Sequence, residues 1–279
     1  MTDTGHMASG EFIPRTPEGA DGLAALMKTP GDAVVALDFD GTLAPIVDDP
    51  AAARAHPGAA AALGRLAPLV GTLAIITGRP AATAVEYGGF HQIAGLVVLG
   101  QYGLQRWSEG VLTAPDEPPG VAAVREKLPR LLAAAGAPPE THVEDKGHAV
   151  AVHTRRCAEP QVALDRLRGV LEALADRHGL VVEPGRYVLE LRPPGMDKGV
   201  ALRRLATETK AGSVLFAGDD LGDLAAYDAV EALRSEGLAG LKVLSGSAEV
   251  TALADRADLI VEGPAGVVTL LSWLADSLV

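Results

Sequence analysis

The stretch AVVALDFDGT, residues 33–42, decides the fold expected for this chain. Its apolar residues 33–37 form a run that is too short for a convincing helix and predicts a strand buried on both faces. Gly41 ends this segment. Asp38 and Asp40 are two positions apart, so on a continuing strand both carboxylates point the same way. The pattern predicts a pair of acidic side chains at the carboxyl end of a buried strand.

A buried pair of carboxylates is costly unless a cation lies between them. Open α/β sheets bind ligands at the carboxyl ends of their parallel strands. Asp38 and Asp40 therefore predict a Mg²⁺ site with a nucleophile beside it. An isolated Asp-Gly is more often a capping turn, but a buried strand that ends in Asp-Phe-Asp-Gly-Thr favours a functional site.

Three later segments also carry polar residues at the point where an expected strand ends or an expected helix begins. The apolar run 72–76 ends before Thr77-Gly78-Arg79-Pro80, which offers a hydroxyl, a glycine and a cation ahead of a helix and so predicts a phosphate cradle. Asp197 caps a helix that begins at Lys198. The buried run 213–217 leads into Gly218, Asp219 and Asp220. We expect all of these residues at the same end of one parallel sheet.

Composition limits the other possibilities. The chain has 279 residues, 48% of them hydrophobic, and a formal net charge of −12, which argues against nucleic acid as a partner. Cys157 is the single cysteine, so no intrachain disulfide forms, and a cytoplasmic setting is expected. No apolar run is long enough for a membrane span. We expect no membrane partner and a monomer.

The expected organisation is an α/β core interrupted by a second domain. Residues 1–20 lack periodicity and are expected to be a disordered tail, with a short helix over 21–28. Residues 21–106 and 192–279 alternate strands and helices and predict a parallel-sheet core. Residues 107–191 change to a β-α-β-β-α-β-β order, which predicts an inserted α+β domain.

Together these residues support phosphoryl transfer to an aspartate. Asp38 would attack phosphorus, and Asp40 would act as general acid and then as general base. Thr77 and the Gly78 amide would hold the phosphoryl oxygens, and Lys198 would offset their charge. The predicted Mg²⁺ ligands are oxygen atoms: the Asp38 side chain, the Asp40 carbonyl and Asp219, with Asp220 as a further candidate.

These residues resemble, one by one, the catalytic motifs of the haloacid dehalogenase-like phosphatases, which implies a Rossmann-like core with an inserted cap. Within that superfamily the chain is similar to the trehalose-6-phosphate phosphatases. The similarity rests on Glu144-Asp145-Lys146, His153-Thr154-Arg155, and Gly185-Arg186 through Glu190 before Arg192-Pro193. It implies Mg²⁺-dependent hydrolysis of trehalose 6-phosphate, a sugar phosphate, through an aspartyl phosphate. The implied substrate contacts are Glu144, Lys146, Arg186 and Glu190, with Arg79 as a further candidate.

The chain departs from that family at three positions. Tyr102 stands where the family usually has His, Gln105 where it has Glu, and Arg186 where lysine is common. A phosphatase for sucrose phosphate or mannosylphosphoglycerate is the nearest alternative. A phospho-aspartate signalling module is disfavoured by Asp40 and by the insertion. An inactive interaction domain is disfavoured because every expected catalytic position is filled.

Overall fold

The computed structural model describes residues 12–47, 49–185, 187–246 and 253–279. It divides into two compact units. The first combines Met1–Leu112 with Asp197–Val279, and the second is Thr113–Met196. The expected borders at 107 and 191 instead fall inside strands, because residues 105–108 continue the sheet of the first unit and residues 188–192 that of the second.

The first unit is built on an eight-stranded sheet with the order β12-β11-β10-β1-β2-β3-β4-β5. The strands are β1 (Ala33–Leu37), β2 (Thr72–Ile76), β3 (Leu96–Gly100), β4 (Gln105–Ser108), β5 (Val111–Thr113), β10 (Ser213–Gly218), β11 (Ala239–Gly246) and β12 (Leu259–Glu262). The six strands from β12 to β3 pair in parallel. The α/β fold with a parallel sheet is confirmed.

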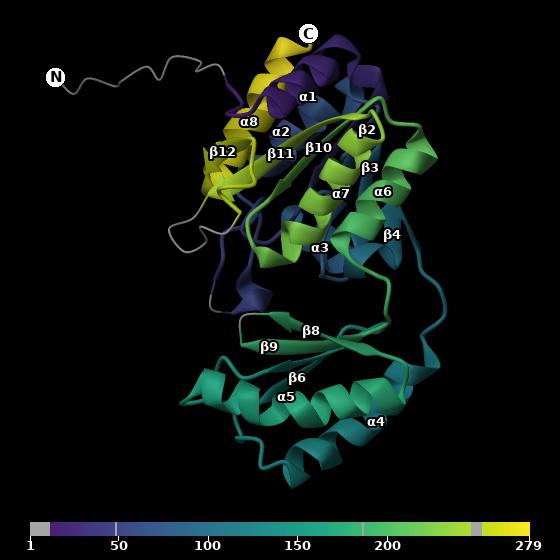
Figure 1. Ribbon diagram of the computed structural model, residues 1–279, viewed down its shortest axis with the longest axis vertical. Coiled ribbons are helices and arrows are strands. Elements are labelled where there is room, and N and C mark those ends of the chain that lie inside the picture. The colour runs from purple at the N-terminus through teal and green to yellow at the C-terminus, as the bar shows by residue number, and fades with distance from the viewer. Residues whose placement is uncertain (1–11, 48, 186, 247–252) are drawn as a thin grey trace, which may run out of the picture. The chain divides into compact units, whose positions relative to one another are not determined.

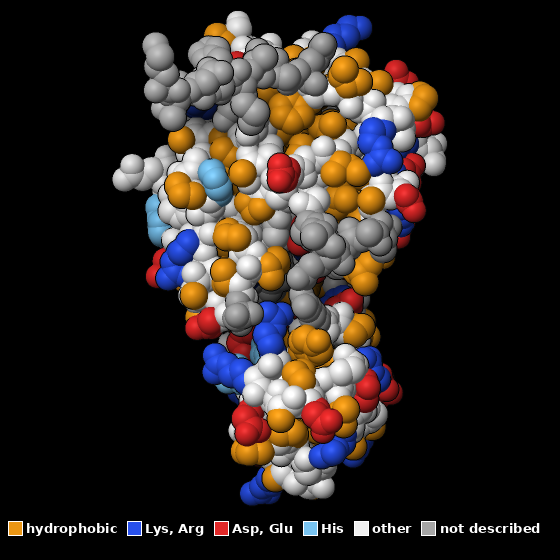
Figure 2. Space-filling model, turned by 90° about the vertical axis from the view of Figure 1, so that its left-hand side faces the viewer, with side chains coloured by type: hydrophobic (Ala, Val, Ile, Leu, Met, Phe, Trp, Pro, Cys, Tyr) orange, Lys and Arg blue, Asp and Glu red, His pale blue; other side chains and the backbone are white. Residues whose placement is uncertain are grey.

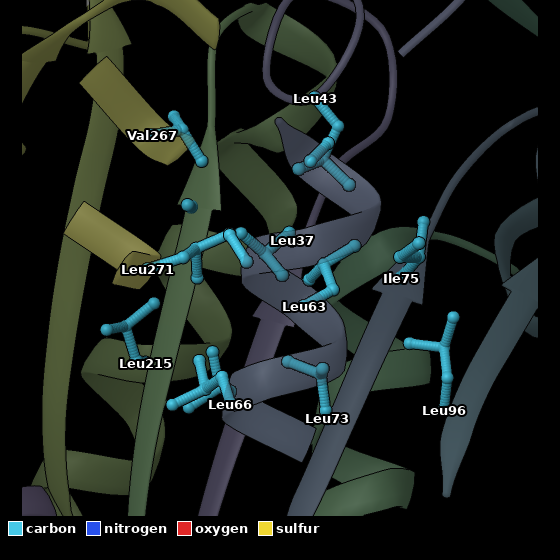
Figure 3. Close-up of a cluster of buried hydrophobic side chains, with 14 of the residues drawn as sticks. Leu37, Leu43, Leu63, Leu66, Leu73, Ile75, Leu96, Leu215, Val267 and Leu271 are labelled. Atoms are coloured by element: carbon cyan, nitrogen blue, oxygen red, sulfur yellow. The ribbon is translucent and has the colours of Figure 1, made fainter. Parts of the chain in front are cut away.

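Helices cover both faces of this sheet (Figure 1). They are α1 (Pro17–Lys28), α2 (Ala59–Leu66), α3 (Ala81–Gly88), α6 (Lys198–Thr209), α7 (Leu224–Ser235) and α8 (Gly263–Ser277). Successive side chains of β1 enter opposite layers: Val35 and Leu37 pack with α2 and α8, while Val34 and Ala36 pack with α6 and α7. This alternation is why the strand is apolar throughout. Figure 3 shows the first layer, where Leu63 and Leu66 of α2 meet Leu37 and Leu73.

Two segments differ from the expectations. β4 pairs antiparallel with β3, and Trp107 is buried in the main core, so the change of sequence character at this point marks the edge of the first sheet rather than a new domain. Helix α1 begins at Pro17, because the Thr16 hydroxyl accepts a hydrogen bond from the Gly19 amide and caps it. The expected tail therefore ends earlier than residue 20. Residues 1–11 lie outside the described part.

The second unit packs two helices on one face of a four-stranded antiparallel sheet of order β6-β7-β9-β8 (Figure 1). The elements are α4 (Pro119–Ala134), β6 (His142–Asp145), β7 (Val150–His153), α5 (Pro160–Arg177), β8 (Val181–Gly185) and β9 (Val188–Arg192). Its core joins Val150, Val152, Leu189 and Leu191 to the helices. Because side chains alternate along a strand, the other face carries polar residues.

None of the helices in the described ranges combines the length and apolar character that crossing a membrane requires. On the face seen in Figure 2, acidic and basic side chains are interspersed over each unit.

Candidate active site

The carboxyl ends of β1 and β10 form the centre of the site. These strands are neighbours at the point where the strand order reverses, the position at which open α/β sheets bind ligands. Asp38 follows β1, and its amide donates to the Ala217 carbonyl of β10 at 2.8 Å. Asp219 follows β10. Both side chains are buried, at 4% and 5% exposure. The structure therefore brings together the two aspartates that the sequence placed on separate strands.

Gly41 permits this close approach. Its φ of +76° lies in the left-handed region, and a Cβ there would come within 1.9 Å of Asp219 Oδ2. The hydroxyl of Ser245 in β11 donates to the Gly41 carbonyl at 2.7 Å and fixes the turn. Any larger residue at this position would displace the Asp219 carboxylate.

Lys198 is the cation at the centre of the site. It begins α6, and its Nζ lies 2.7 Å from Asp38 Oδ1 and 2.7 Å from Asp223 Oδ1. Burial opposes the charge, but Asp223 and Asp38 together raise the pKa of Lys198 well above its ordinary value. Lys198 is therefore a fixed positive charge against the side chain of Asp38.

Asp223 is a site residue that the sequence reasoning missed. It is fully buried, and its Oδ2 accepts hydrogen bonds from the amides of Asp219 at 2.9 Å and Asp220 at 3.2 Å. A second acidic residue four positions after Asp219 was the available signal, because the turn from 220 to 223 folds it back. Asp220, predicted as a further metal ligand, caps this turn: its Oδ1 accepts from the Gly222 amide at 2.8 Å.

Asp38, Asp219 and Asp223 could hold a metal ion. One carboxylate oxygen from each lies within 4.8 Å of the others. Asp219 Oδ1 is buried and has no hydrogen-bond partner among the described residues. Burial raises the pKa of Asp38 well above its usual range, and burial with the nearby Asp223 raises that of Asp219 to about 8. These ligands are all carboxylate oxygens, and the raised pKa values of Asp38 and Asp219 mean that a nearby positive charge would favour their ionised form. Both properties fit a hard divalent cation such as Mg²⁺.

The predicted phosphate cradle follows β2 at the same edge of the sheet. The buried Thr77 accepts from the Arg79 amide at 3.1 Å through its hydroxyl, and its carbonyl accepts from the Tyr102 amide at 3.0 Å. A Cβ on Gly78 would lie 2.8 Å from the Tyr102 hydroxyl, so the Tyr102 ring packs closely over this glycine. Gln105 accepts from the Ala81 amide at 2.8 Å and caps α3.

Arg79 is bound to Asp40. Its Nε and Nη2 donate to the two carboxylate oxygens of Asp40, each at 2.7 Å. Arg79 was predicted as a substrate contact, and Asp40 as the acid and base. The structure joins the two in one ion pair.

The remaining predicted substrate contacts lie in the second unit. Glu144 Oε2 is 2.9 Å from His153 Nε2, and Lys146 pairs with the buried Glu190. Glu144 of β6 and Glu190 of β9 both lie opposite Ala151 of β7, so they share one face of the sheet. That is the face opposite the helices. Arg186 lies outside the described residues.

Comparison with known proteins places this fold in a class. A haloacid dehalogenase-like hydrolase from Bacteroides thetaiotaomicron superposes with a TM-score of 0.62 at 16% identity, covering 86% of this chain and 98% of that one. Trehalose-6-phosphate phosphatase of Aspergillus fumigatus superposes with a TM-score of 0.65 at 26% identity, covering 95% and 99%. The fold is that of the haloacid dehalogenase-like hydrolases. Residues 36–258 match the family model for trehalose-phosphatase, and the chain belongs to that family.

Curated relatives agree with this assignment. Trehalose-phosphate phosphatase of Mycolicibacterium paratuberculosis is 34% identical over 274 residues, covering 93% of this chain and 65% of the relative. That of Mycobacterium marinum is 34% identical over 276 residues, covering 92% and 66%. The chain thus spans just under two thirds of the length of these relatives.

Proposed function

We propose that this chain hydrolyses trehalose 6-phosphate to trehalose and phosphate through an aspartyl phosphate on Asp38. The observation that carries the proposal is the buried Asp38 carboxylate, held by Lys198 at the end of β1 in a chain of the trehalose-phosphatase family. Asp38 Oδ1 is bonded to Lys198, which leaves its second oxygen to attack.

The reaction has two balanced steps. In the first, the Asp38 oxygen forms a bond to phosphorus as the bond from phosphorus to the sugar oxygen breaks, and Asp40 gives its proton to that oxygen. In the second, Asp40 takes a proton from water as the water oxygen attacks phosphorus. Phosphate leaves, and the Asp38 carboxylate is restored.

Other residues of the first unit hold the phosphoryl group. The Thr77 hydroxyl and the Gly78 amide donate to its oxygens, and Lys198 offsets its charge. Mg²⁺ would be held by Asp38, Asp219 and the Asp40 carbonyl, and when bound it supplies charge neutralisation at the nucleophile and the phosphate oxygens. Asp223 holds Lys198 and the turn that carries Asp219 in place.

The polar face of the second unit supplies the sugar contacts. Glu144, Lys146 and Glu190 offer acceptors and donors in alternation, which suits the many hydroxyls of a disaccharide. The Glu144–His153 contact and the Lys146–Glu190 ion pair already pre-orient these groups. Arg186 remains a proposed contact on the strength of the family pattern alone.

The test is phosphate release from trehalose 6-phosphate by the purified chain, with Mg²⁺ and with EDTA. Sucrose 6-phosphate and mannosylphosphoglycerate are run in parallel, and Asp38→Asn serves as the control for a contaminating phosphatase. We expect trehalose 6-phosphate to have the highest kcat/KM and EDTA to abolish turnover. A higher kcat/KM for either other sugar phosphate would overturn the substrate assignment, and EDTA-resistant turnover would overturn the metal requirement.

A further inference from the structure

A second ion pair lies beside the nucleophile and does not involve the nucleophile itself. Arg79 and Asp40 meet in a two-pronged ion pair, with both N···O distances at 2.7 Å. The Arg79 side chain is only 15% exposed and that of Asp40 36%. Two parallel bonds between a planar guanidinium and a planar carboxylate fix the plane of the carboxylate as well as its position.

The guanidinium of Arg79 is itself held in place. Its Nη1 donates to the Pro50 carbonyl at 2.9 Å. Its Cζ lies 5.7 Å from the ring centre of Phe39 and 5.4 Å from that of Tyr87. A cation over aromatic faces gains attraction without giving up its in-plane donors. The position of the Arg79 guanidinium is therefore fixed, and the guanidinium in turn holds the Asp40 carboxylate.

The backbone of Arg79 is anchored as well. Its amide donates to the Thr77 hydroxyl at 3.1 Å, and its carbonyl accepts from the Gln101 amide at 2.9 Å. The residue thus belongs to the turn that carries Thr77 and Gly78, so the orientation of Asp40 is tied to the proposed phosphate cradle. Asp40, the proposed acid and base, would therefore keep its position relative to the phosphoryl group.

We propose that Arg79 is a positioning residue, which orients the Asp40 carboxylate for proton transfer at the leaving oxygen and at water, rather than a ligand of phosphate or sugar. The inference rests on the proposed function. A carboxylate has about four lone-pair directions, and the guanidinium occupies two of them. The two that remain lie away from Arg79 and are held in one orientation for the reacting oxygens. Orientation of this kind contributes to rate without contributing to substrate affinity.

This role makes a specific kinetic prediction. A group that acts through Asp40 matters most when the leaving oxygen needs a proton, and least when it leaves readily as a phenolate. Arg79→Met should therefore lower kcat by about 10- to 100-fold on an alkyl phosphate such as trehalose 6-phosphate, with KM nearly unchanged. On p-nitrophenyl phosphate the loss should stay within a few-fold. Arg79→Lys keeps the positive charge but loses the planar pair of donors, so its kcat on trehalose 6-phosphate should be little better than that of Arg79→Met.

The experiment measures kcat and KM for wild type, Arg79→Met, Arg79→Lys, Asp40→Asn and the Arg79→Met/Asp40→Asn double variant. The substrates are p-nitrophenyl phosphate, phenyl phosphate, benzyl phosphate and trehalose 6-phosphate. Arg54→Met is the matched control, because Arg54 stacks 4.2 Å from the centre of the same Tyr87 ring and, among the described residues, hydrogen-bonds to the carbonyls of Ala51 and Ala53. Thermal unfolding of each variant identifies any that fail to fold.

The expected result is a leaving-group dependence that is steeper in Arg79→Met than in wild type, and no further loss when Arg79→Met is added to Asp40→Asn. Equal rises in KM on all substrates, or additive losses in the double variant, would overturn the inference and make Arg79 a ligand. If Arg79→Met unfolds, the folded Arg79→Lys variant decides by the same criteria. A wild type active on the simple esters but inert on trehalose 6-phosphate would overturn the proposed function and leave this test standing.

Discussion

The acidic cluster of the first unit and the polar sheet face of the second unit hold their charges in different ways. In the first, the fully buried Asp223 is fixed by main-chain amides, and Lys198, only 6% exposed, is fixed by two carboxylates. In the second, the Lys146–Glu190 pair is also largely buried, at 14% and 7% exposure, whereas His153 and Glu144, which contact each other, are 23% and 40% exposed. The first arrangement is buried and fixed before any ligand arrives, while in the second the more exposed Glu144–His153 contact can exchange partners.

Because of this difference, we expect the two regions to have different roles in the reaction. A fixed buried charge array stabilises a reacting group in the same way whatever is attached to it. A half-exposed contact such as Glu144–His153 can give up its partner to a hydroxyl group at small cost, because water already competes for it. Changes in the first region should therefore affect every phosphate ester, and changes in the second should affect sugar phosphates alone.

The largest effect is expected from Asp38→Asn. Loss of the nucleophile should lower kcat by at least about 10³-fold on trehalose 6-phosphate and p-nitrophenyl phosphate alike. Steady-state kinetics on both esters measures it. Near-native turnover on either ester would show that Asp38 is not the nucleophile. The two regions would then no longer differ in which substrates they affect.

The next effect concerns metal affinity. Asp219→Asn should raise the Mg²⁺ concentration for half-maximal activity by about 10²-fold or more, because it neutralises a buried oxygen ligand. Asp220→Asn is the matched comparison. It changes a neighbouring carboxylate that caps a turn, and should shift the Mg²⁺ requirement much less. Mg²⁺ titrations of activity check this, and equal shifts in the two variants would place the ion elsewhere.

In the second unit, Glu190→Ala should cut kcat/KM on trehalose 6-phosphate by about 10²-fold, because it removes a buried carboxylate that pairs with Lys146 and would accept from sugar hydroxyls. Glu144→Ala should act in the same direction. Hydrolysis of p-nitrophenyl phosphate should stay within a few-fold of wild type. Glu172→Ala, on the exposed side of α5, is the control. Parallel losses on both substrates would mean that the unit misfolds, and no loss on either would show that this face does not select the sugar.

The smallest effect is a pH dependence of stability in the metal-free protein. The pKa of Asp219 is raised from 3.8 to about 8 on folding, so the folded state binds the proton more tightly than the unfolded chain. This contribution to stability is therefore fully present at low pH, and falls progressively as pH rises from about 4 through about 8. The Tm in EDTA should drop between about pH 4 and about pH 8, and Mg²⁺ should raise it most at the upper end.

The Asp219→Asn variant sharpens that measurement, because it removes the titrating group and should flatten the pH dependence. A Tm in EDTA that rises over the same interval, or a slope that is unchanged in Asp219→Asn, would contradict the assignment.

The sequence alone was sufficient for the parallel sheet and for the main residues of the first region. Buried strands such as 33–37 have no polar alternation, and the ends of parallel strands meet at one edge, so Asp38 and Asp219 could be placed together before the fold was known. Such inferences depend only on the local pattern and on the geometry that all parallel sheets share.

The tertiary structure decided which groups are partners. Asp220 and Asp223 are both acidic and close in sequence, and only the turn from 220 to 223 shows that Asp223 points inward while Asp220 caps. Arg79 and Asp40 are separated by 39 positions, and nothing in the local pattern pairs them. β4 was missed for the same reason, since pairing with β3 is a long-range property of the sheet edge. Local sequence fixes backbone periodicity, whereas the choice of side-chain partner depends on which distant segments folding brings within hydrogen-bond reach.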